Sequence, residues 1–203
     1  MKKTLALLAV ISSLILTGCS QVNSAATVGD VTISQTALQK SVDEIYAQRK
    51  TIDTSGMQLE TGATLNRSQL RFMILTAIFD DIAKELKISV SNTLLSQTKS
   101  GLIAQSGGEA TMTQNLVAAG IAPSSFDSYV RAVIISNQIT KAFADGGATD
   151  AEASQKFSQL VAAKAKTLHI KVNPRYGTWD ETSVDLVEVD AAGSAVASTT
   201  STK

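Results

Sequence analysis

Apolar residues recur at three- and four-residue spacing through most of the chain between residues 34 and 166. This spacing places them on one face of a helix, so the pattern predicts a mainly helical fold. The most apolar stretch, residues 66–86, has almost no polar side before Asp80, and we expect it to be buried on most faces at the centre of the domain. Residues 50–64 are expected to form a loop. The predicted helices begin near Ser34, Asn66, Ser91, Ala110, Pro123 and Thr149.

Residues at the starts of these segments match the preferences of helix termini. Ser34, Asn66 and Ser91 are typical caps, because their side-chain oxygens accept hydrogen bonds from free backbone N–H groups. The sequence Thr149-Asp150-Ala151-Glu152 is a capping box, and Pro123 suits a first helical turn. These local signals indicate where the helices begin.

Period-two alternation, typical of strands, occurs at the two ends of the helical region. Residues 27–33 predict a short β-hairpin around Gly29-Asp30. Apolar and polar residues alternate from Leu168 to Val172, which predicts a half-buried strand that ends in a turn at residues 173–177. Val184 and Leu186 predict either one more short strand or a segment that runs over the surface. The expected fold class is therefore mainly α, with a short N-terminal β-hairpin and one or two short C-terminal strands.

The first nineteen residues have the organisation of an export signal. Lys2 and Lys3 precede an apolar stretch from Leu5 to Leu16, which is too short to span a bilayer. Gly18 then places a small residue before Cys19, the single cysteine of the chain. The pattern predicts export of the protein and cleavage of the signal between Gly18 and Cys19.

The sequence Leu16-Thr17-Gly18-Cys19 resembles the lipobox of bacterial lipoproteins. The resemblance implies that the thiol of Cys19 carries a diacylglyceryl group, which would anchor the protein to the extracytoplasmic side of the cell membrane. Two acyl chains hold a protein stably at a membrane, whereas one chain binds only marginally. A free thiol after an ordinary secretory signal and an uncleaved signal anchor remain as alternatives.

The chain is expected to have four parts. Because residues 190–203 contain mainly Ala, Ser and Thr, we expect this tail to be disordered. The parts are a signal peptide at 1–18, a lipidated tether at 19–26, a helical domain at 27–189 and the tail at 190–203.

Charge and cysteine content narrow the function classes. The whole chain has a formal net charge of 0, and loss of the signal would remove Lys2 and Lys3 but no acidic residue. The mature protein is then slightly acidic, so nucleic acid is not expected as a partner. If Cys19 is acylated, no thiol remains for a disulfide, and the fold depends on its hydrophobic core.

Residue types that carry chemistry are sparse. His169 is the single histidine, and neither a nucleophile elbow nor a glycine-rich phosphate loop occurs in the sequence. Asp81 and Glu85 lie one helical turn apart, but Lys84 between them favours a solvated helix face over a metal or acid–base site. The sequence therefore predicts no catalytic residues, no metal site and no small-molecule cofactor.

Arg175, Tyr176 and Trp179 are the candidate partner-binding residues. Arginine, tyrosine and tryptophan concentrate binding energy at protein interfaces, so these three side chains within five positions can form a recognition surface. In the alternative interpretation, Trp179 covers the helical core and Arg175 pairs with a helix carboxylate or a helix C-terminus. Aromatic and methionine residues at positions 72, 73 and 79 are expected in the core.

The order of these segments resembles the N-terminal helical domain of SurA-type chaperones and PrsA-type foldase lipoproteins. The resemblance covers roughly residues 26–180. Val172-Asn173-Pro174-Arg175-Tyr176-Gly177-Thr178-Trp179-Asp180 is also similar to the ending of actinobacterial lipoproteins of this group. The other pieces that carry the resemblance are the lipoprotein signal, residues 28–34 before a helix, the apolar helix at 66–86, residues 88–91 before the next helix and the capping box at 149–152.

The resemblance implies a chaperone-like domain that binds unfolded or partly folded exported polypeptides. Many relatives also carry a parvulin-type prolyl isomerase domain, and Leu168-His169-Ile170 is similar to its first strand. The partner residues and remaining strands of such a domain are missing after residue 180, so we expect no enzyme. Two alternatives stay open, namely an accessory or structural envelope lipoprotein with one specific protein partner, and a prolyl isomerase.

Overall fold

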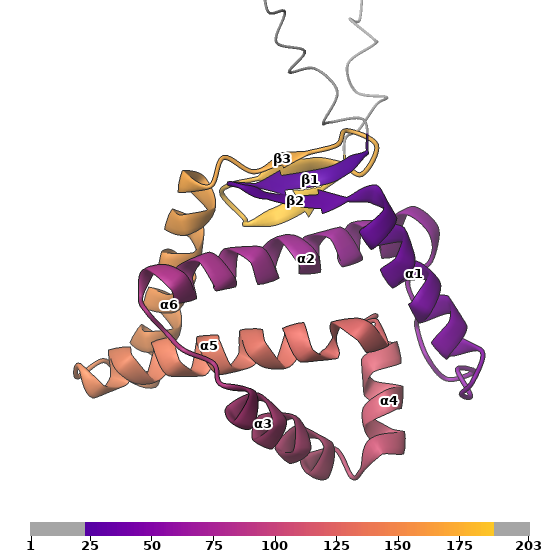
Figure 1. Cartoon of the computed structure of the whole chain (residues 1–203), viewed down its shortest axis with the longest axis horizontal. Coiled ribbons are helices and arrows are strands. Elements are labelled where there is room, and N and C mark those ends of the chain that lie inside the picture. The colour runs from indigo at the N-terminus through magenta and orange to yellow at the C-terminus, as the bar shows by residue number, and fades with distance from the viewer. Residues whose placement is uncertain (1–22, 189–203) are drawn as a thin grey trace, which may run out of the picture.

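The computed structural model describes residues 23–188, and Figure 1 shows their arrangement. Gly18, Cys19, the expected signal and the expected tail at 190–203 lie outside the described residues. The helices are α1 (Gln35–Arg49), α2 (Gly62–Glu85), α3 (Asn92–Gln105), α4 (Glu109–Ala118), the 3-10 helix η1 (Pro123–Ser125), α5 (Phe126–Asp145) and α6 (Asp150–Thr167). The strands are β1 (Ser24–Val28), β2 (Val31–Ser34), β3 (Lys171–Val172), β4 (Thr178–Asp180) and β5 (Asp185–Val187). The mainly helical fold class is confirmed.

Three helices begin where the sequence predicted. The Ser34 hydroxyl accepts from the backbone N–H of Ala37 at 3.0 Å, and the Ser91 hydroxyl accepts from that of Leu94 at 3.2 Å. The capping box is complete, because Thr149 and Glu152 each bond the other's backbone N–H. The backbone bond from Thr149 is the main reason that the pKa of Glu152 lies below its ordinary value. Local sequence thus determines the starts of α1, α3 and α6.

Two other predicted helix starts are wrong. Helix α2 begins at Gly62, one turn before the predicted cap Asn66, and the N–H of Gly62 donates to the Tyr46 hydroxyl at 3.0 Å. The extra turn buries Leu65 completely, so tertiary packing extends the helix. Pro123 begins η1 rather than α5, which starts at Phe126.

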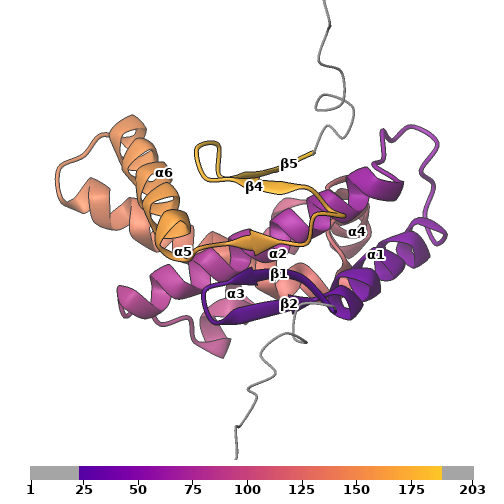
Figure 2. The same ribbon diagram turned by 90° about the horizontal axis from the view of Figure 1, so that it is seen from above.

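The first and last parts of the described chain meet in one sheet. Its strand order is β2-β1-β3, and Ala26 of β1 pairs with both Ile33 of β2 and Val172 of β3. Figure 2 shows β2 at one margin of this sheet and β3 at the other. Strands β4 and β5 form a separate antiparallel pair, with Trp179 opposite Leu186. The short C-terminal strands predicted from the sequence are therefore present.

Two boundaries near this sheet differ from the prediction. Strand β1 begins at Ser24, within the expected tether, because Ala25 and Ala26 are buried against the rest of the domain. The predicted strand from Leu168 is reduced to Lys171–Val172. Leu168 instead caps α6, and its carbonyl accepts from Gly29 at 2.8 Å, while His169 takes a left-handed φ of 45° that breaks the strand.

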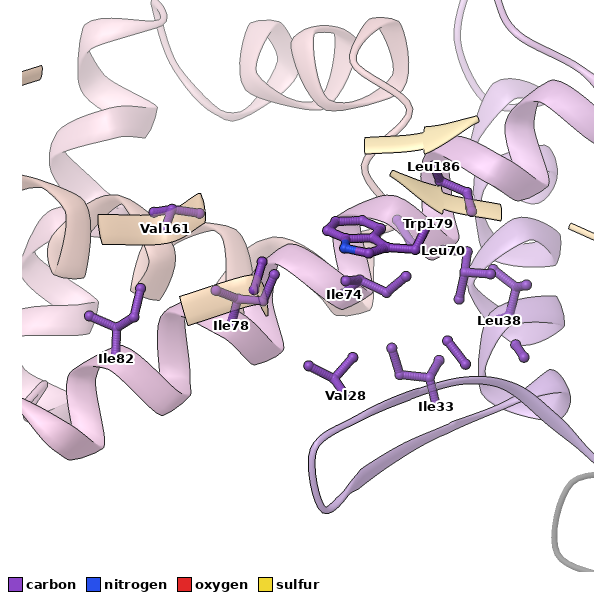
Figure 3. Close-up of a cluster of buried hydrophobic side chains, with 14 of the residues drawn as sticks. Val28, Ile33, Leu38, Leu70, Ile74, Ile78, Ile82, Val161, Trp179 and Leu186 are labelled. Carbon is purple, nitrogen blue, oxygen red and sulfur yellow. The ribbon is translucent and has the colours of Figure 1, made fainter. Parts of the chain in front are cut away.

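Helix α2 runs through the centre of the hydrophobic core. Figure 1 places it between the sheet and α5, and Figure 3 shows Ile74 beside Val28, Ile33 and Trp179, with Ile82 toward Val161. One face of α2 is at most 1% exposed, through Leu70, Ile74, Ile78 and Ile82. Burial on most faces is not observed, since Phe72, Leu75 and Phe79 remain partly exposed.

Helices α3 and α4 form an arm that is packed more loosely, which we call the α3–α4 arm. It lies on the side of α5 away from the sheet (Figure 1). Helix α3 has no fully buried residue, and α4 has one, Val117. The arm packs on a second cluster centred on Phe126, Val130 and Ile134 of α5. Its contributing side chains, all partly buried, are Leu94, Leu95, Leu102, Ile103, Met112 and Leu116.

Candidate functional site

An open apolar depression lies between α2 and α5, and we call it the α2–α5 groove. From α2 it is lined by Phe72, Leu75, Thr76 and Phe79, which recur at helical spacing on one face. Its volume is about 280 Å³, and most of its surface is contributed by carbon atoms. The wall from α5 consists of Tyr129, Ala132, Val133, Ser136 and Asn137. An exposed apolar surface of this kind is typical of a site that binds another molecule.

Two of the large apolar side chains that line the groove have no part in either hydrophobic cluster. Phe79 packs against Phe157 of α6 with ring centroids 5.6 Å apart, and Leu75 also contacts the main core. Phe72 and Val133, in contrast, belong neither to the main core nor to the cluster beneath the arm. Their apolar surface faces the groove without a corresponding contribution to the core, which favours a binding role for this position.

The groove continues into a second hollow of about 440 Å³ toward the end of α4. Phe72, Leu75 and Tyr129 line both spaces. The second hollow is more polar, with Glu60, Arg71 and the backbone around Gly120 on its walls. The combined depression thus has an apolar part and a part rich in hydrogen-bonding groups.

A buried polar network fixes the wall of the second hollow. Gln69 is 2% exposed, and its side-chain oxygen accepts from the Ser41 hydroxyl at 3.0 Å. Its side-chain amide donates to the carbonyl of Gly120. Both polar atoms of the Gln69 amide are therefore satisfied, and the network holds α1, α2 and the end of α4 in a fixed arrangement.

The structure separates the three predicted partner-binding residues. Trp179 is 8% exposed and packs in the main core, as the alternative interpretation expected. Arg175 and Tyr176 remain at the surface, where they line a hollow of about 710 Å³ along α1. The Arg175 guanidinium lies 5.3 Å from the Tyr176 ring centroid and donates to the side-chain oxygen of Gln35 at 3.2 Å. Its partner is thus an amide, not the expected carboxylate or helix C-terminus.

The carboxylates that the sequence placed on a solvated face form an interhelical ion-pair site. Lys164 of α6 contacts Asp81 at 3.0 Å and also Glu85, both on α2. The Lys164 side chain is 14% exposed. Hydrogen bonds to Glu85 first, and to Asp81 second, raise the pKa of Lys164 above its ordinary value. The site joins α6 to α2, so its role is structural.

The described residues contain little that points to catalysis. Between residues 23 and 188, no three His, Cys, Asp or Glu side chains come close enough together to hold a metal ion. His169 follows α6 in a left-handed turn, outside the α2–α5 groove. No helix in this part of the chain combines the length and the apolar character needed to cross a bilayer. The absence of a cofactor stays a prediction.

Sequence reasoning missed the groove because it assigned Phe72 and Phe79 to the core. One signal was present in the sequence, since apolar residues between positions 70 and 79 cover more of the helix surface than a single core contact requires. The pattern does not show which of these faces stays open. That depends on where α5 and α6 pack against α2.

The fold and the groove together define a mainly helical domain with a small antiparallel sheet and an open apolar surface. The model of the SurA-like N-terminal domain family matches residues 1–140, which is more than half of the chain. The protein therefore belongs to the family of SurA-like N-terminal domains. No curated protein matches the chain.

Membership of this family suggests a chaperone-type role. The matched residues 1–140 include α1, α2 and all residues of α5 that line the α2–α5 groove. The family match does not include a parvulin domain. The surface described above therefore belongs to the part of the chain that defines the family.

Proposed function

We propose that this protein is a membrane-anchored lipoprotein whose helical domain binds unfolded or partly folded exported polypeptides. The observation that carries the proposal is the α2–α5 groove, where Phe72 and Val133 present apolar surface that neither hydrophobic cluster uses. Unfolded chains differ from folded ones in the apolar side chains that they expose, so a groove of this kind distinguishes the two states. Membership of the SurA-like family supports the same function.

The size of the groove fits weak binding of many sequences. A volume of about 280 Å³ accommodates only a few side chains at a time. The partly buried aromatic rings and the loosely packed α3–α4 arm beside them can adapt to different side chains. Anchoring through Cys19 would hold this surface close to emerging exported chains, where a high local concentration compensates for weak affinity.

Suppression of aggregation tests the proposal. Residues 20–203 are added to two unrelated proteins during refolding, and light scattering is measured over time. We expect wild-type protein to suppress scattering for both clients, and the double variant Phe72→Gln/Val133→Thr to lose most of this effect. The matched control is Leu86→Gln/Val187→Thr, which removes apolar surface at residues 48% and 42% exposed outside the groove.

Three outcomes would contradict this proposal. The first is that wild-type protein at several-fold molar excess leaves both clients unaffected. The second is that the groove variant is as active as the wild type. The third is that the control loses as much activity as the groove variant. Suppression confined to one client would favour an accessory lipoprotein with a specific partner. Circular dichroism spectra that match the wild type establish that each variant is folded.

The anchor requires its own experiment. We expect Cys19→Ala to leave the precursor unprocessed or to release the protein from membranes, because the alanine side chain has no thiol to receive the lipid. Cell fractionation and labelling with a radioactive fatty acid measure both properties. Unchanged processing and membrane retention of the variant would refute lipidation at Cys19.

A further inference from the structure

Strand β2 has an open edge in the three-stranded sheet. The strand order β2-β1-β3 leaves β2 with a strand partner on one side only, and Figure 2 shows no described element beside its outer margin. Strand edges of this kind pair readily with another extended chain unless charge, proline or a covering segment prevents it. The sequence Val-Thr-Ile-Ser of β2 contains neither a charged residue nor a proline.

The register shows which backbone groups of β2 face outward. On the β3 side of β1, the carbonyl of Ala25 accepts from Asn173 at 2.9 Å, and the N–H of Gly29 donates to Leu168 at 2.8 Å. Successive residues of a strand direct their backbone groups to opposite sides, so the even-numbered residues of β1 bond to β2. The backbone groups of Val31 and Ile33, which pair with Val28 and Ala26, therefore point toward β1. The N–H and C=O of Thr32 therefore point away from β1, outward from the edge of the sheet.

A hollow beside this edge would receive side chains of an added strand. We call it the hairpin hollow; it has a volume of about 460 Å³ and lies between the β1–β2 turn and α2. Val31 lies on the same sheet face as buried Ile33, yet it is 51% exposed. Met73 and Ala77 of α2 add further apolar surface. The edge thus combines free backbone groups with adjacent apolar surface.

We propose that β2 binds an extended polypeptide segment as an additional strand, with alternate apolar side chains of that segment covering Val31 and entering the hairpin hollow. An extended backbone is the occupant that supplies a donor and an acceptor at the spacing of the Thr32 groups, because the backbone groups of a helix are already paired. The rim of the hollow carries balanced charge, since Asp80 pairs with Arg131 at 2.6 Å and Asp81 pairs with Lys164 at 3.0 Å. The remaining charged residues of the rim, Asp30 and Lys84, have opposite signs.

This inference rests on the proposed function and adds a binding mode to it. Thr76 of α2 lines both the hairpin hollow and the α2–α5 groove, so the two surfaces adjoin on α2. A client chain that pairs with β2 can continue across α2 into the groove. Backbone pairing supplies affinity without sequence preference, and the groove supplies selection for apolar side chains.

The test compares Thr32→Pro with Thr32→Val in the full domain, residues 20–203. Proline removes the outward N–H, and its ring blocks the edge, while the fold keeps its own hydrogen bonds because this N–H is not used within the sheet. Valine keeps the N–H and the strand conformation. The probe is a short fluorescein-labelled peptide of alternating valine and threonine, and its affinity is measured by fluorescence anisotropy.

We expect Thr32→Pro to weaken peptide binding by about five- to tenfold, the effect of one or two lost hydrogen bonds, and Thr32→Val to bind like the wild type. The same peptide with N-methylated backbone amides should bind the wild type as weakly as the normal peptide binds Thr32→Pro. Equal affinities of the proline and valine variants would refute strand addition at β2. If the wild type binds no peptide but suppresses aggregation, strand addition alone is refuted; if it does neither, the proposed function fails as well.

Discussion

The core around α2 and the α3–α4 arm use similar aliphatic side chains but bury them to very different degrees. In the core, Ile74 and Ile78 are 0% exposed and are enclosed by the sheet and α6. In the arm, residues such as Leu102 and Ile103 are only partly buried, and α3 has no fully buried side chain. The sequence predicts helices in both regions and marks residues 66–86 as the most apolar stretch, but it does not show how much less the arm is buried than the core.

This difference indicates how stability and binding are divided within the domain. Segments with few buried apolar contacts open locally at a lower free energy than the core. The arm packs next to Tyr129, which also lines the α2–α5 groove. Motion of the arm can therefore change the groove without disturbing the packing around Ile78. A rigid core then supports an adaptable binding surface.

The largest effect is expected from cavity formation in the core. Ile78→Ala should lower the free energy of unfolding by about 2–5 kcal/mol, because a fully buried side chain leaves a cavity that its neighbours fill only partly. Leu102→Ala in the arm should cost less, about 1 kcal/mol, since this side chain is only partly buried and leaves no enclosed cavity. Urea denaturation monitored by circular dichroism measures both values. Equal losses at the two positions would remove the distinction between core and arm.

A smaller effect is expected where the β4–β5 pair covers the core. Gly177 has a φ of +128°, and a Cβ atom there would collide with the backbone carbonyl of Val187. Gly177→Ala should destabilise the domain by about 1–3 kcal/mol and shift the emission of Trp179 to longer wavelength, because the indole loses its cover. Trp179 is the single tryptophan, so the emission reports on this site.

Gly147→Ala is the matched control for this substitution. Gly147 also has a positive φ, +92°, but a Cβ atom there would meet nothing within 4 Å. The control therefore isolates backbone strain from collision, and we expect it to leave the Trp179 emission unchanged. If both variants lose the same stability, the collision with Val187 does not matter.

The ion pairs that join α6 to the core should contribute less again. Lys164→Met is expected to cost about 1 kcal/mol near neutral pH, because the three charged groups are partly solvated. The raised pKa of Lys164 sets the pH dependence: its stabilisation is complete below the ordinary value of 10.5 and is lost as the pH rises through the higher value in the folded protein. Urea denaturation of wild type and variant from about pH 7 to pH 11 measures the difference. A difference that grows with pH would contradict this assignment.

The smallest effect on stability is expected from a substitution in the α3–α4 arm. Gly101 lies within α3, and an added Cβ atom would meet nothing within 4 Å. Gly101→Ala should therefore stabilise α3 by about 0.5–1 kcal/mol, because alanine loses less backbone freedom in a helix. Amide hydrogen exchange should be faster in α3 than in α2 of the wild type, and about threefold slower in α3 of the variant. Wild-type exchange that is equally slow in both helices would refute the loose packing of the arm.

The features that sequence predicted correctly depend on neighbouring residues. Ser34, Ser91 and the Thr149 capping box act within one helical turn, so their positions can be read directly. The start of α2 depends on Tyr46 and the burial of Leu65, and the shortening of β3 depends on Leu168 meeting Gly29. Contacts between residues distant in sequence were therefore the main source of error.

The candidate site was less predictable than the fold for a related reason. Phe72 and Ile74 are two positions apart on the same helix, and nothing in their spacing reveals that Ile74 is enclosed while Phe72 faces an open groove. The alternative interpretation paired Arg175 with a helix carboxylate or a helix C-terminus, but its hydrogen-bond partner is the uncharged side chain of Gln35, which charge pattern does not identify. The position of α5 against α2 determines that Phe72 faces a groove, and the turn before β4 determines which side chain Arg175 contacts.

The pairing of β1 with β3 also determines the order in which the protein can be completed. Synthesis proceeds from the N-terminus, so Ala26 is made early and waits for its partner Val172 until nearly all described residues have been added. Pairing residues so far apart also closes a long chain segment, which has an entropic cost. Until Val172 is added, the β1–β2 hairpin has two open edges, the β1 edge that later pairs with β3 and the outer edge of β2. A protein proposed to protect unfinished chains would itself pass through a stage with an unfinished sheet.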